Sequence, residues 1–167
     1  SMAVAHARAG VDILAFYDDT GTQEALQISP RTWRKWIKPI WAKVISAARA
    51  ASADAIMFMH SCGMVAEIIP DFLDCGIEVI NVQPELIDPA EIKRKYGRRV
   101  CQWGTISAQR TLPLGTPEDV RAEVRERVKL GQEGGLILSP SNTIGPEVPV
   151  ENVLAFIEAA KEYTVIR

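Results

Sequence analysis

The sequence predicts an α/β fold in which about five strand–helix units share a parallel sheet. Two observations support this prediction: short apolar runs alternate with amphipathic helical stretches, and the helical stretches begin and end at capping signals. Such an alternation fits either a doubly wound sheet or a barrel. The chain has 167 residues, whereas a barrel of eight units usually needs about 250. We therefore expect a single domain, residues 1–167, that forms a partial (β/α)8 TIM barrel, roughly its last five units.

The predicted strands are short and almost continuously apolar, as expected for parallel strands that are covered on both faces. They are Val11–Tyr17, Ala55–Met59, Ile77–Val82, Arg99–Trp103 and Gly135–Ser139. A dinucleotide-binding fold would carry a glycine-rich phosphate loop after its first strand, but Asp18–Gly21 stands there. This difference weakens the doubly wound alternative.

Three predicted helices begin with a capping residue that is followed by proline. The caps are Ser29, Asp88 and Thr116, and proline is favoured directly after a cap. Glu91 stands where it can complete a capping box with Asp88.

Apolar residues recur at helical spacing after Ser29, between Trp33 and Ala48, which predicts one long helix with a buried stripe. Pro39 falls inside this stretch and is expected to kink the helix, because proline cannot donate a backbone hydrogen bond. Gly76 and Gly97 mark the ends of later helices, just before the next strand.

The composition excludes several classes of function. The net charge is −2 without any basic block, which argues against binding to nucleic acid or to a membrane surface. No apolar run reaches the roughly 18 residues of a membrane span. Three cysteines at irregular spacing do not form a disulfide framework, so we expect a reducing, cytoplasmic location.

Polar residues follow the predicted strands, where parallel α/β folds place their functional groups. Loop carboxylates and polar turns are also common at such positions without any function. In chain order these residues are Asp18 and Asp19, His60 to Cys62, Gln83 and Glu85, Gly104 and Thr105, and Ser141 and Asn142.

His60 and Cys62 form the most specific pair among them. Residues two apart in an extended segment point to the same side, so both side chains can reach one ion, and a nitrogen–sulfur pair favours zinc. The alternative is a buried cysteine beside a histidine that is bonded to a carbonyl. Asp18 and Asp19 can orient a substrate, accept a proton or supply an oxygen ligand, or they can be ordinary loop or cap carboxylates. Cys75 and Cys101 are interpreted as small core residues.

Several segments, taken in order, resemble the uroporphyrinogen decarboxylase superfamily over nearly the whole chain. His60-Ser61-Cys62-Gly63 matches the HxCG motif of its methyltransferase branch. The other similar segments are Tyr17–Gln23, Ile28–Pro39, Asn81–Pro84, Asp88–Ala90, Trp103–Ile106, Leu114–Glu118, Ser139–Ile144 and Val148–Asn152.

This resemblance implies a zinc-dependent methyltransferase that moves a methyl group from a corrinoid, which a corrinoid protein can carry, to a thiol. His60 and Cys62 match two zinc ligands of that branch, whereas Asn142 stands in place of a late cysteine that is the third. An oxygen ligand such as Asp19 or Glu85 could complete the site. Asp19, His60 and Cys62 are the catalytic candidates.

The segments that resemble the family also supply candidates for substrate contact: Asp18, Gln83, Glu85, Trp103 and Asn142. The alternative substrate is a tetrapyrrole carboxylate, which a decarboxylase of the family would act on. The family's N-terminal segments have no counterpart here, so an inactive fragment of either enzyme is a further alternative. Because a half-barrel exposes strand edges and apolar surface, we also expect a homo-oligomer.

Overall fold

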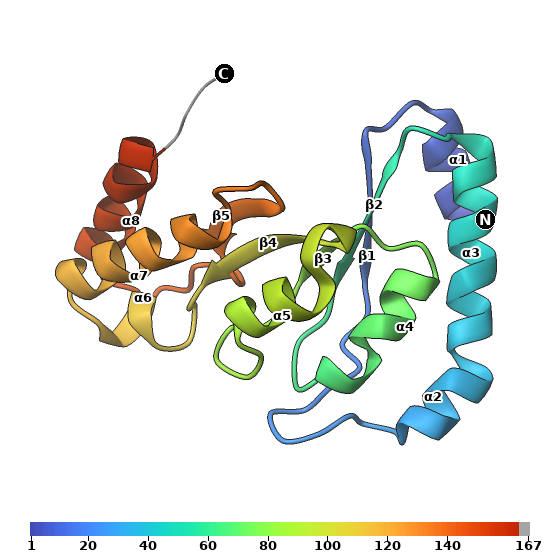
Figure 1. Cartoon of the computed structure of the whole chain (residues 1–167), viewed down its shortest axis with the longest axis horizontal. Coiled ribbons are helices and arrows are strands. Elements are labelled where there is room, and N and C mark those ends of the chain that lie inside the picture. The colour runs from blue at the N-terminus through green and yellow to red at the C-terminus, as the bar shows by residue number, and fades with distance from the viewer. Residues whose placement is uncertain (164–167) are drawn as a thin grey trace. The chain divides into compact units, whose positions relative to one another are not determined.

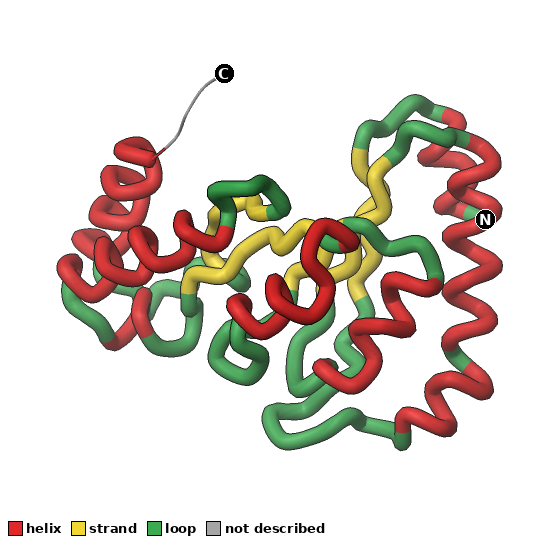
Figure 2. Tube along the Cα trace, viewed as in Figure 1, coloured by secondary structure: helices red, strands yellow, loops and turns green. Residues whose placement is uncertain are grey.

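The computed structural model describes residues 1–163, and in these residues strands alternate with helices as predicted (Figure 1 and Figure 2). The chain divides into two compact units, Ser1–Val82 and the part that begins at Gln83. All five predicted strands are present in the described residues, with bounds that differ by a few positions. The prediction of an α/β fold is therefore confirmed.

The first unit contains three parallel strands, β1 (Ile13–Tyr17), β2 (Ile56–His60) and β3 (Val79–Asn81), which pair in this order. Tyr17 lies opposite His60, and His60 lies opposite Asn81, so the carboxyl ends of the three strands are level. The helices of this unit are α1 (Met2–Arg8), α2 (Pro30–Trp36), α3 (Lys38–Ala51) and α4 (Ile69–Asp74), with a 3₁₀ turn at Ala66–Ile68.

Strand β1 is covered on one face only. On the covered face Leu14 is buried, and the ring of Phe16 meets Trp41 of α3 edge-on, with the ring centres 5.3 Å apart. On the other face Ile13, Ala15 and Tyr17 are exposed. The expectation that both faces are covered is therefore wrong for β1, because the helices of this unit lie on one side of its strands (Figure 1).

The long helix predicted after Ser29 is two helices, not one kinked helix. Ser29 caps α2 as expected, since its side chain accepts a hydrogen bond from the backbone N–H of Thr32. The chain then breaks at Ile37, and α3 restarts with Pro39 in its first turn. Proline is tolerated in a first turn, where its missing N–H would have no partner within the helix.

A buried carboxylate joins α2 and α3 to α4. The side chain of Asp71 is 7% exposed and accepts from Arg34 Nε at 2.9 Å and from Lys38 Nζ at 2.8 Å. Lys38 also contacts Asp74 at 3.0 Å. The hydrogen bond to Asp71 is the main reason why the pKa of Lys38 lies above its ordinary value.

The second unit contains the parallel pair β4 (Cys101–Ile106) and β5 (Leu136–Pro140). Its helices are α5 (Pro89–Tyr96), α6 (Thr111–Leu114), α7 (Pro117–Leu130) and α8 (Val150–Tyr163), with a 3₁₀ turn at Gly97–Arg99. The buried residues that form its core are Ile106, Leu112, Val120, Val124, Ala155 and Ala159. None of the helices in residues 1–163 combines the length and the apolar character of a membrane span.

A buried asparagine joins α8 to the segment before α7. Asn152 is 1% exposed, and its side-chain amide donates to the carbonyls of Leu112 at 2.8 Å and Gly115 at 2.7 Å. The amide therefore satisfies two carbonyls at the end of the short helix α6, which would otherwise lack donors.

The predicted caps of this unit are present, but the capping box is on a different helix. Asp88 accepts from the backbone N–H of Ala90, whereas Glu91 turns to Lys95, with its carboxylate 2.6 Å from the ammonium. The box predicted for Glu91 is therefore wrong, because an i,i+4 partner competes for the carboxylate. The reciprocal bonds of a capping box join Thr116 and Asp119, and they hold the pKa of Asp119 below its ordinary value.

Strand β4 ends later than predicted. Gly104 and Thr105, which were expected to follow the strand, lie inside it and both have positive φ, 122° and 81°. Thr105 is the one described residue other than glycine with positive φ. A β-branched residue is strained in this conformation.

Candidate metal site

The candidate site forms where β1 and β2 end side by side. Because Tyr17 and His60 are partners in a parallel pair, the residues after each strand leave the sheet at the same edge. The loop after β1 begins with Asp18 and Asp19, and the loop after β2 begins with Ser61 and Cys62. The two loops are therefore placed to share one site.

Asp19, His60 and Cys62 come together there. The sulfur of Cys62 lies 3.3 Å from Nε2 of His60, and one carboxylate oxygen of Asp19 lies 3.8 Å from the same nitrogen. One potential ligand atom from each residue lies within 4.8 Å of the other two. The prediction that His60 and Cys62 point to the same side is confirmed, and Asp19 adds an oxygen donor beside them.

A residue of β3 orients the imidazole. Oδ1 of Asn81 lies 2.7 Å from Nδ1 of His60, and Asn81 is 8% exposed. If this oxygen accepts the proton of Nδ1, the lone pair of Nε2 faces Cys62 and Asp19, which is the orientation a metal ligand needs. The ring of Tyr17 lies 5.6 Å from the ring of His60 and flanks it on the β1 side.

The middle residue of the motif joins the two loops. Ser61 is buried, and its hydroxyl contacts both the backbone N–H of Thr20 at 3.2 Å and the hydroxyl of Thr20 at 3.1 Å. The sequence pattern gave no role to either residue, and neither did it identify Asn81 as the partner of His60. The pairing of strands revealed these contacts, since the residues are far apart along the chain.

Asp18 does not join the cluster. Its carboxylate accepts a hydrogen bond from the indole N–H of Trp41 at 3.1 Å, on the side of the sheet that α3 covers. The two adjacent aspartates thus face opposite ways, as alternating residues at a strand end do.

The other candidates for substrate contact belong to the second unit. Gln83 is 3% exposed, and its carbonyl accepts from the backbone N–H groups of Leu86 and Ile87. Trp103 is half-buried within β4, and Asn142 is exposed after β5, where its side chain accepts from the N–H of Thr143. Gln83, Trp103 and Asn142 therefore belong to a different compact unit from Asp19, His60 and Cys62.

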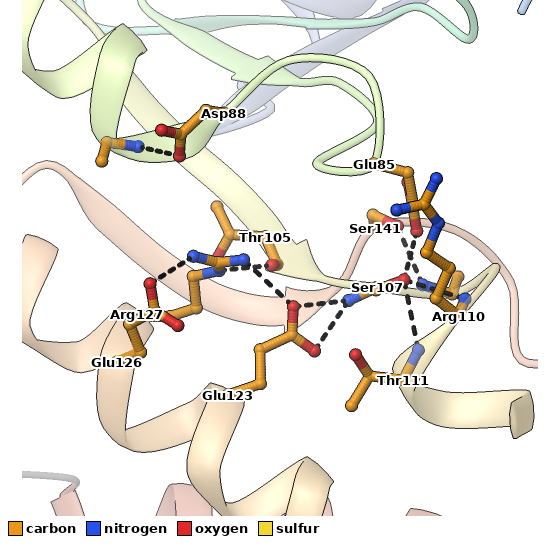
Figure 3. Close-up of polar contacts among 12 residues, drawn as sticks. Glu85, Asp88, Thr105, Ser107, Arg110, Thr111, Glu123, Glu126, Arg127 and Ser141 are labelled. Atoms are coloured by element: carbon orange, nitrogen blue, oxygen red, sulfur yellow. Dashed lines mark hydrogen bonds and ion pairs between the residues drawn. The ribbon is translucent and has the colours of Figure 1, made fainter. Parts of the chain in front are cut away.

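Glu85 takes part in a polar network of the second unit (Figure 3). One of its oxygens accepts from the hydroxyl of Ser107 at 2.6 Å and from the N–H of Gln109 at 3.1 Å. The hydroxyl of Ser107 also accepts from the N–H of Arg110 at 2.9 Å. The hydroxyl of Ser107 therefore supports the turn that follows β4.

A partly buried ion pair supports the same turn from α7. Arg127 and Glu123 have side chains that are 13% and 10% exposed, and they contact each other at 3.2 Å. Arg127 donates to the carbonyl of the strained Thr105, and Glu123 accepts from the N–H of Ser107 (Figure 3). Their spacing of four residues on a predicted helix was the signal that could have identified the pair.

The two other cysteines differ from Cys62. Cys75 is buried and Cys101 is half-buried, and desolvation raises the pKa of both thiols. A raised pKa disfavours the thiolate, which is the form that binds metals. The interpretation as a core residue is confirmed for Cys75, whereas Cys101 is only half-buried in β4.

The sequence of this chain is similar to that of one protein family and of named relatives. The family model described as uroporphyrinogen decarboxylase (URO-D) matches residues 1–163. A methylcobamide:CoM methyltransferase, MtaA, from Methanosarcina barkeri is 33% identical over 156 residues, which are 93% of this chain and 43% of that protein. A uroporphyrinogen decarboxylase from Trichodesmium erythraeum is 23% identical over 155 residues, which are 92% of this chain and 41% of that protein.

Among solved structures, a methyltransferase from Methanosarcina mazei matches with a TM-score of 0.76 and 28% identity. The match covers 96% of this chain and 46% of that one, and it confirms the prediction of a partial TIM-barrel fold. The chain therefore spans less than half the length of the relatives it matches.

Proposed function

Because this chain belongs to the uroporphyrinogen decarboxylase (URO-D) family, we propose that it is part of a zinc-dependent methyltransferase that moves a methyl group from a corrinoid to a thiol. Membership alone does not choose between methyl transfer and decarboxylation, since relatives with both names match this chain. The higher identity of the relative that is named a methylcobamide:CoM methyltransferase supports methyl transfer.

The observation that carries the proposal is the contact between His60 and Cys62. Their donor atoms lie 3.3 Å apart, and one carboxylate oxygen of Asp19 lies within 4.8 Å of both. The residues fit a zinc ion, because imidazole nitrogen, thiolate sulfur and carboxylate oxygen are its usual protein ligands. A bound zinc would hold the acceptor thiol as a thiolate, which is the nucleophile for methyl transfer.

The residues of this chain would hold and orient the reactants. His60 and Cys62 bind the metal, and Asn81 keeps the imidazole in its ligand orientation through the 2.7 Å contact. Asp18, Gln83, Glu85, Trp103 and Asn142 remain our candidates for contact with the substrate. A corrinoid protein is the expected partner for the donor.

Metal content tests the proposal most directly. We expect about one zinc per chain in protein that is purified without a metal-affinity tag, and loss of this zinc in Cys62→Ala. Cys101→Ala is the matched control, because it removes a thiol that lies in β4 and should leave the zinc in place. Zinc that is absent from the wild type, or unchanged in Cys62→Ala, would refute the metal site.

Methyl transfer is the second measurement. With methylcobalamin as donor and CoM as acceptor, the zinc-loaded chain should form methylated thiol, and Cys62→Ala should lose this activity. Turnover that is equal in both proteins would contradict a role of the metal site in the reaction.

Decarboxylation of a tetrapyrrole carboxylate is the second candidate, supported by the decarboxylase relatives at lower identity. Only one of the two adjacent aspartates, Asp19, faces the cluster, while Asp18 is bonded to Trp41. Binding of uroporphyrinogen to the metal-free chain, unchanged by Cys62→Ala, would favour this candidate over methyl transfer.

A further inference from the structure

We propose that Asp19 is the third protein ligand of the metal, and that a contact between Gly21 and Gly63 holds it in place. This inference rests on the metal site proposed above. It goes beyond that site because it assigns the missing ligand to the loop after β1 and identifies the contact that positions this loop. No late cysteine is then needed where Asn142 stands.

The distances fit a three-ligand site. Donors bound at about 2.0–2.3 Å to a tetrahedral zinc are separated from one another by about 3.3–3.7 Å. The sulfur of Cys62 and the oxygen of Asp19 lie 3.3 Å and 3.8 Å from Nε2 of His60, and no pair of donors is more than 4.8 Å apart. Small side-chain rotations therefore bring all three donors to one ion, with a fourth position left for the substrate thiol.

The carboxylate of Asp19 is already oriented without a metal. The same oxygen that faces His60 accepts from the backbone N–H of Cys62 at 2.9 Å. The side chain of Asp19 is 59% exposed, so packing does not hold it. Its position therefore depends on this hydrogen bond and on the loop that carries it.

That loop is a small hairpin that folds on itself. Gly21 and Leu26 form an antiparallel bridge, and the backbone of Gln27 donates to the carbonyl of Thr20 at 2.9 Å. The side-chain amide of Gln27 also donates to the carbonyl of Asp19 at 2.8 Å. These bonds fix the shape of the hairpin but not its distance from β2.

The distance is set by two glycines that pack backbone to backbone. A Cβ placed on Gly21 would lie 2.7 Å from the backbone nitrogen of Met64 and 2.8 Å from the carbonyl carbon of Gly63. A Cβ on Gly63 would overlap the backbone of Gly21. The close approach lets the N–H of Met64 donate to the carbonyl of Thr22 at 2.7 Å, which closes the hairpin onto the loop that carries Cys62.

Of the two glycines, Gly21 is the better one to substitute, because only steric overlap would disturb the structure there. Gly63 has a φ of +85°, so any side chain there is strained for a second reason, whereas Gly21 has no such restriction. In Gly21→Ala the new methyl group must push the two loops apart, which moves Asp19 away from His60 and Cys62. The substitution leaves all three ligands chemically intact.

Titration of the metal-free full chain with Co²⁺ tests both parts of the proposal. Absorption by the thiolate–cobalt bond shows whether the sulfur of Cys62 binds the metal, and the midpoint of the titration gives the affinity for Co²⁺. We expect Asp19→Ala and Gly21→Ala each to weaken Co²⁺ binding by tenfold or more while the thiolate absorption is retained. Cys62→Ala should lose this absorption.

A double substitution shows whether Gly21 acts through Asp19. If it does, adding Gly21→Ala to Asp19→Ala causes no further loss of affinity, because the ligand that it displaces is already absent. Gly145→Ala is the matched control, since its Cβ would meet only the end of the flexible Glu147 side chain, and it should bind Co²⁺ as the wild type does.

Thr20→Val offers a milder test, should Gly21→Ala lose its cooperative thermal unfolding. It removes the hydroxyl contact to Ser61 but keeps the glycine contact, so we expect a smaller loss of Co²⁺ affinity.

Each part of the proposal has an outcome that would overturn it. If Asp19→Ala binds Co²⁺ as tightly as the wild type while Cys62→Ala loses the thiolate absorption, only the assignment of Asp19 as a ligand is overturned. A further loss in the double variant would overturn the role of Gly21, and a wild type that binds no metal would refute the proposed function itself.

Discussion

The imidazole of His60 takes its orientation from one short contact. Oδ1 of Asn81 lies 2.7 Å from Nδ1, on the far side of the ring from Cys62. Partners of this kind fix the tautomer of a ligating histidine, and their loss typically weakens metal binding by about 10- to 100-fold. Asn81 therefore belongs to the proposed metal site although it offers no ligand.

We predict that Asn81→Ala lowers the affinity for zinc by about 10- to 100-fold, because the imidazole can then rotate or adopt the other tautomer. Asn81→Asp retains an acceptor at the same position and should keep most of the affinity. Competition with a zinc chelator measures both variants. Equal affinity in Asn81→Ala and the wild type would show that the strand alone orients His60.

At the scale of single residues, the sequence predicted that His60 and Cys62 face the same way, but not which residues surround them. Two residues that are two apart in a strand face the same way whatever the rest of the fold does, so this pair was predictable. Asn81 and Thr20 reach the site only through strand pairing and loop contacts. Such contacts depend on the register of the strands, which a single sequence does not contain.

At the scale of elements, the ion cluster around Asp71 connects the helices of the first unit. Its side chain is 7% exposed and has two cationic partners, Arg34 and Lys38, from α2 and α3. Removal of the carboxylate would leave both cations without this anion. We expect Asp71→Ala to lower the free energy of unfolding by about 2 kcal/mol, less than for a fully buried pair because both cations reach solvent.

The pH dependence of this cluster follows from Lys38. Its folded pKa is raised above the ordinary value of 10.5, mainly by the hydrogen bond to Asp71. The resulting stabilisation is fully present below pH 10.5 and is lost as the pH rises through the folded pKa. Urea unfolding should show that the free energy of unfolding of the wild type falls between pH 9 and pH 11.5, and that the fall is smaller in Asp71→Ala. An equal fall in both proteins would exclude Lys38 as the cause.

Capping signals predicted where helices begin, but not which partners the carboxylates choose. Ser29, Asp88 and Thr116 all cap helices as expected. Glu91 instead binds Lys95, which lies one turn along the same helix. The local sequence offered the Glu91 carboxylate two partners, the backbone N–H of Asp88 and the ammonium of Lys95, and did not show which of them it would bind.

At the scale of the whole molecule, the exposed face of β1 offers apolar side chains for contact with another chain. Ile13 is 38% exposed, Tyr17 is 71% exposed, and Ile56 of the neighbouring strand is 39% exposed. Apolar side chains beside the edge of a strand favour contact with another chain. The relatives are more than twice as long as the matched region, so in them further residues are available to cover this face.

We predict that the isolated chain associates with itself through this face. Ile13→Lys combined with Ile56→Lys should shift sedimentation equilibrium toward the monomer. Leu114→Lys is the matched control, because Leu114 is 80% exposed but lies in α6 of the second unit and should leave association unchanged. A wild type that is monomeric at every concentration would remove the expectation of a homo-oligomer.

The three cysteines provide a chemical reporter of the proposed site. Burial raises the pKa of Cys75 and Cys101, so both should react slowly with an electrophile such as iodoacetamide at neutral pH. Cys62 lies half-buried beside an imidazole, and alkylation of the metal-free chain should therefore occur there first. Peptide mass spectrometry can follow each thiol separately. Added zinc should protect Cys62 and leave the other two rates unchanged, so that the labelling pattern of one sample reports occupancy at the site and integrity of the core together.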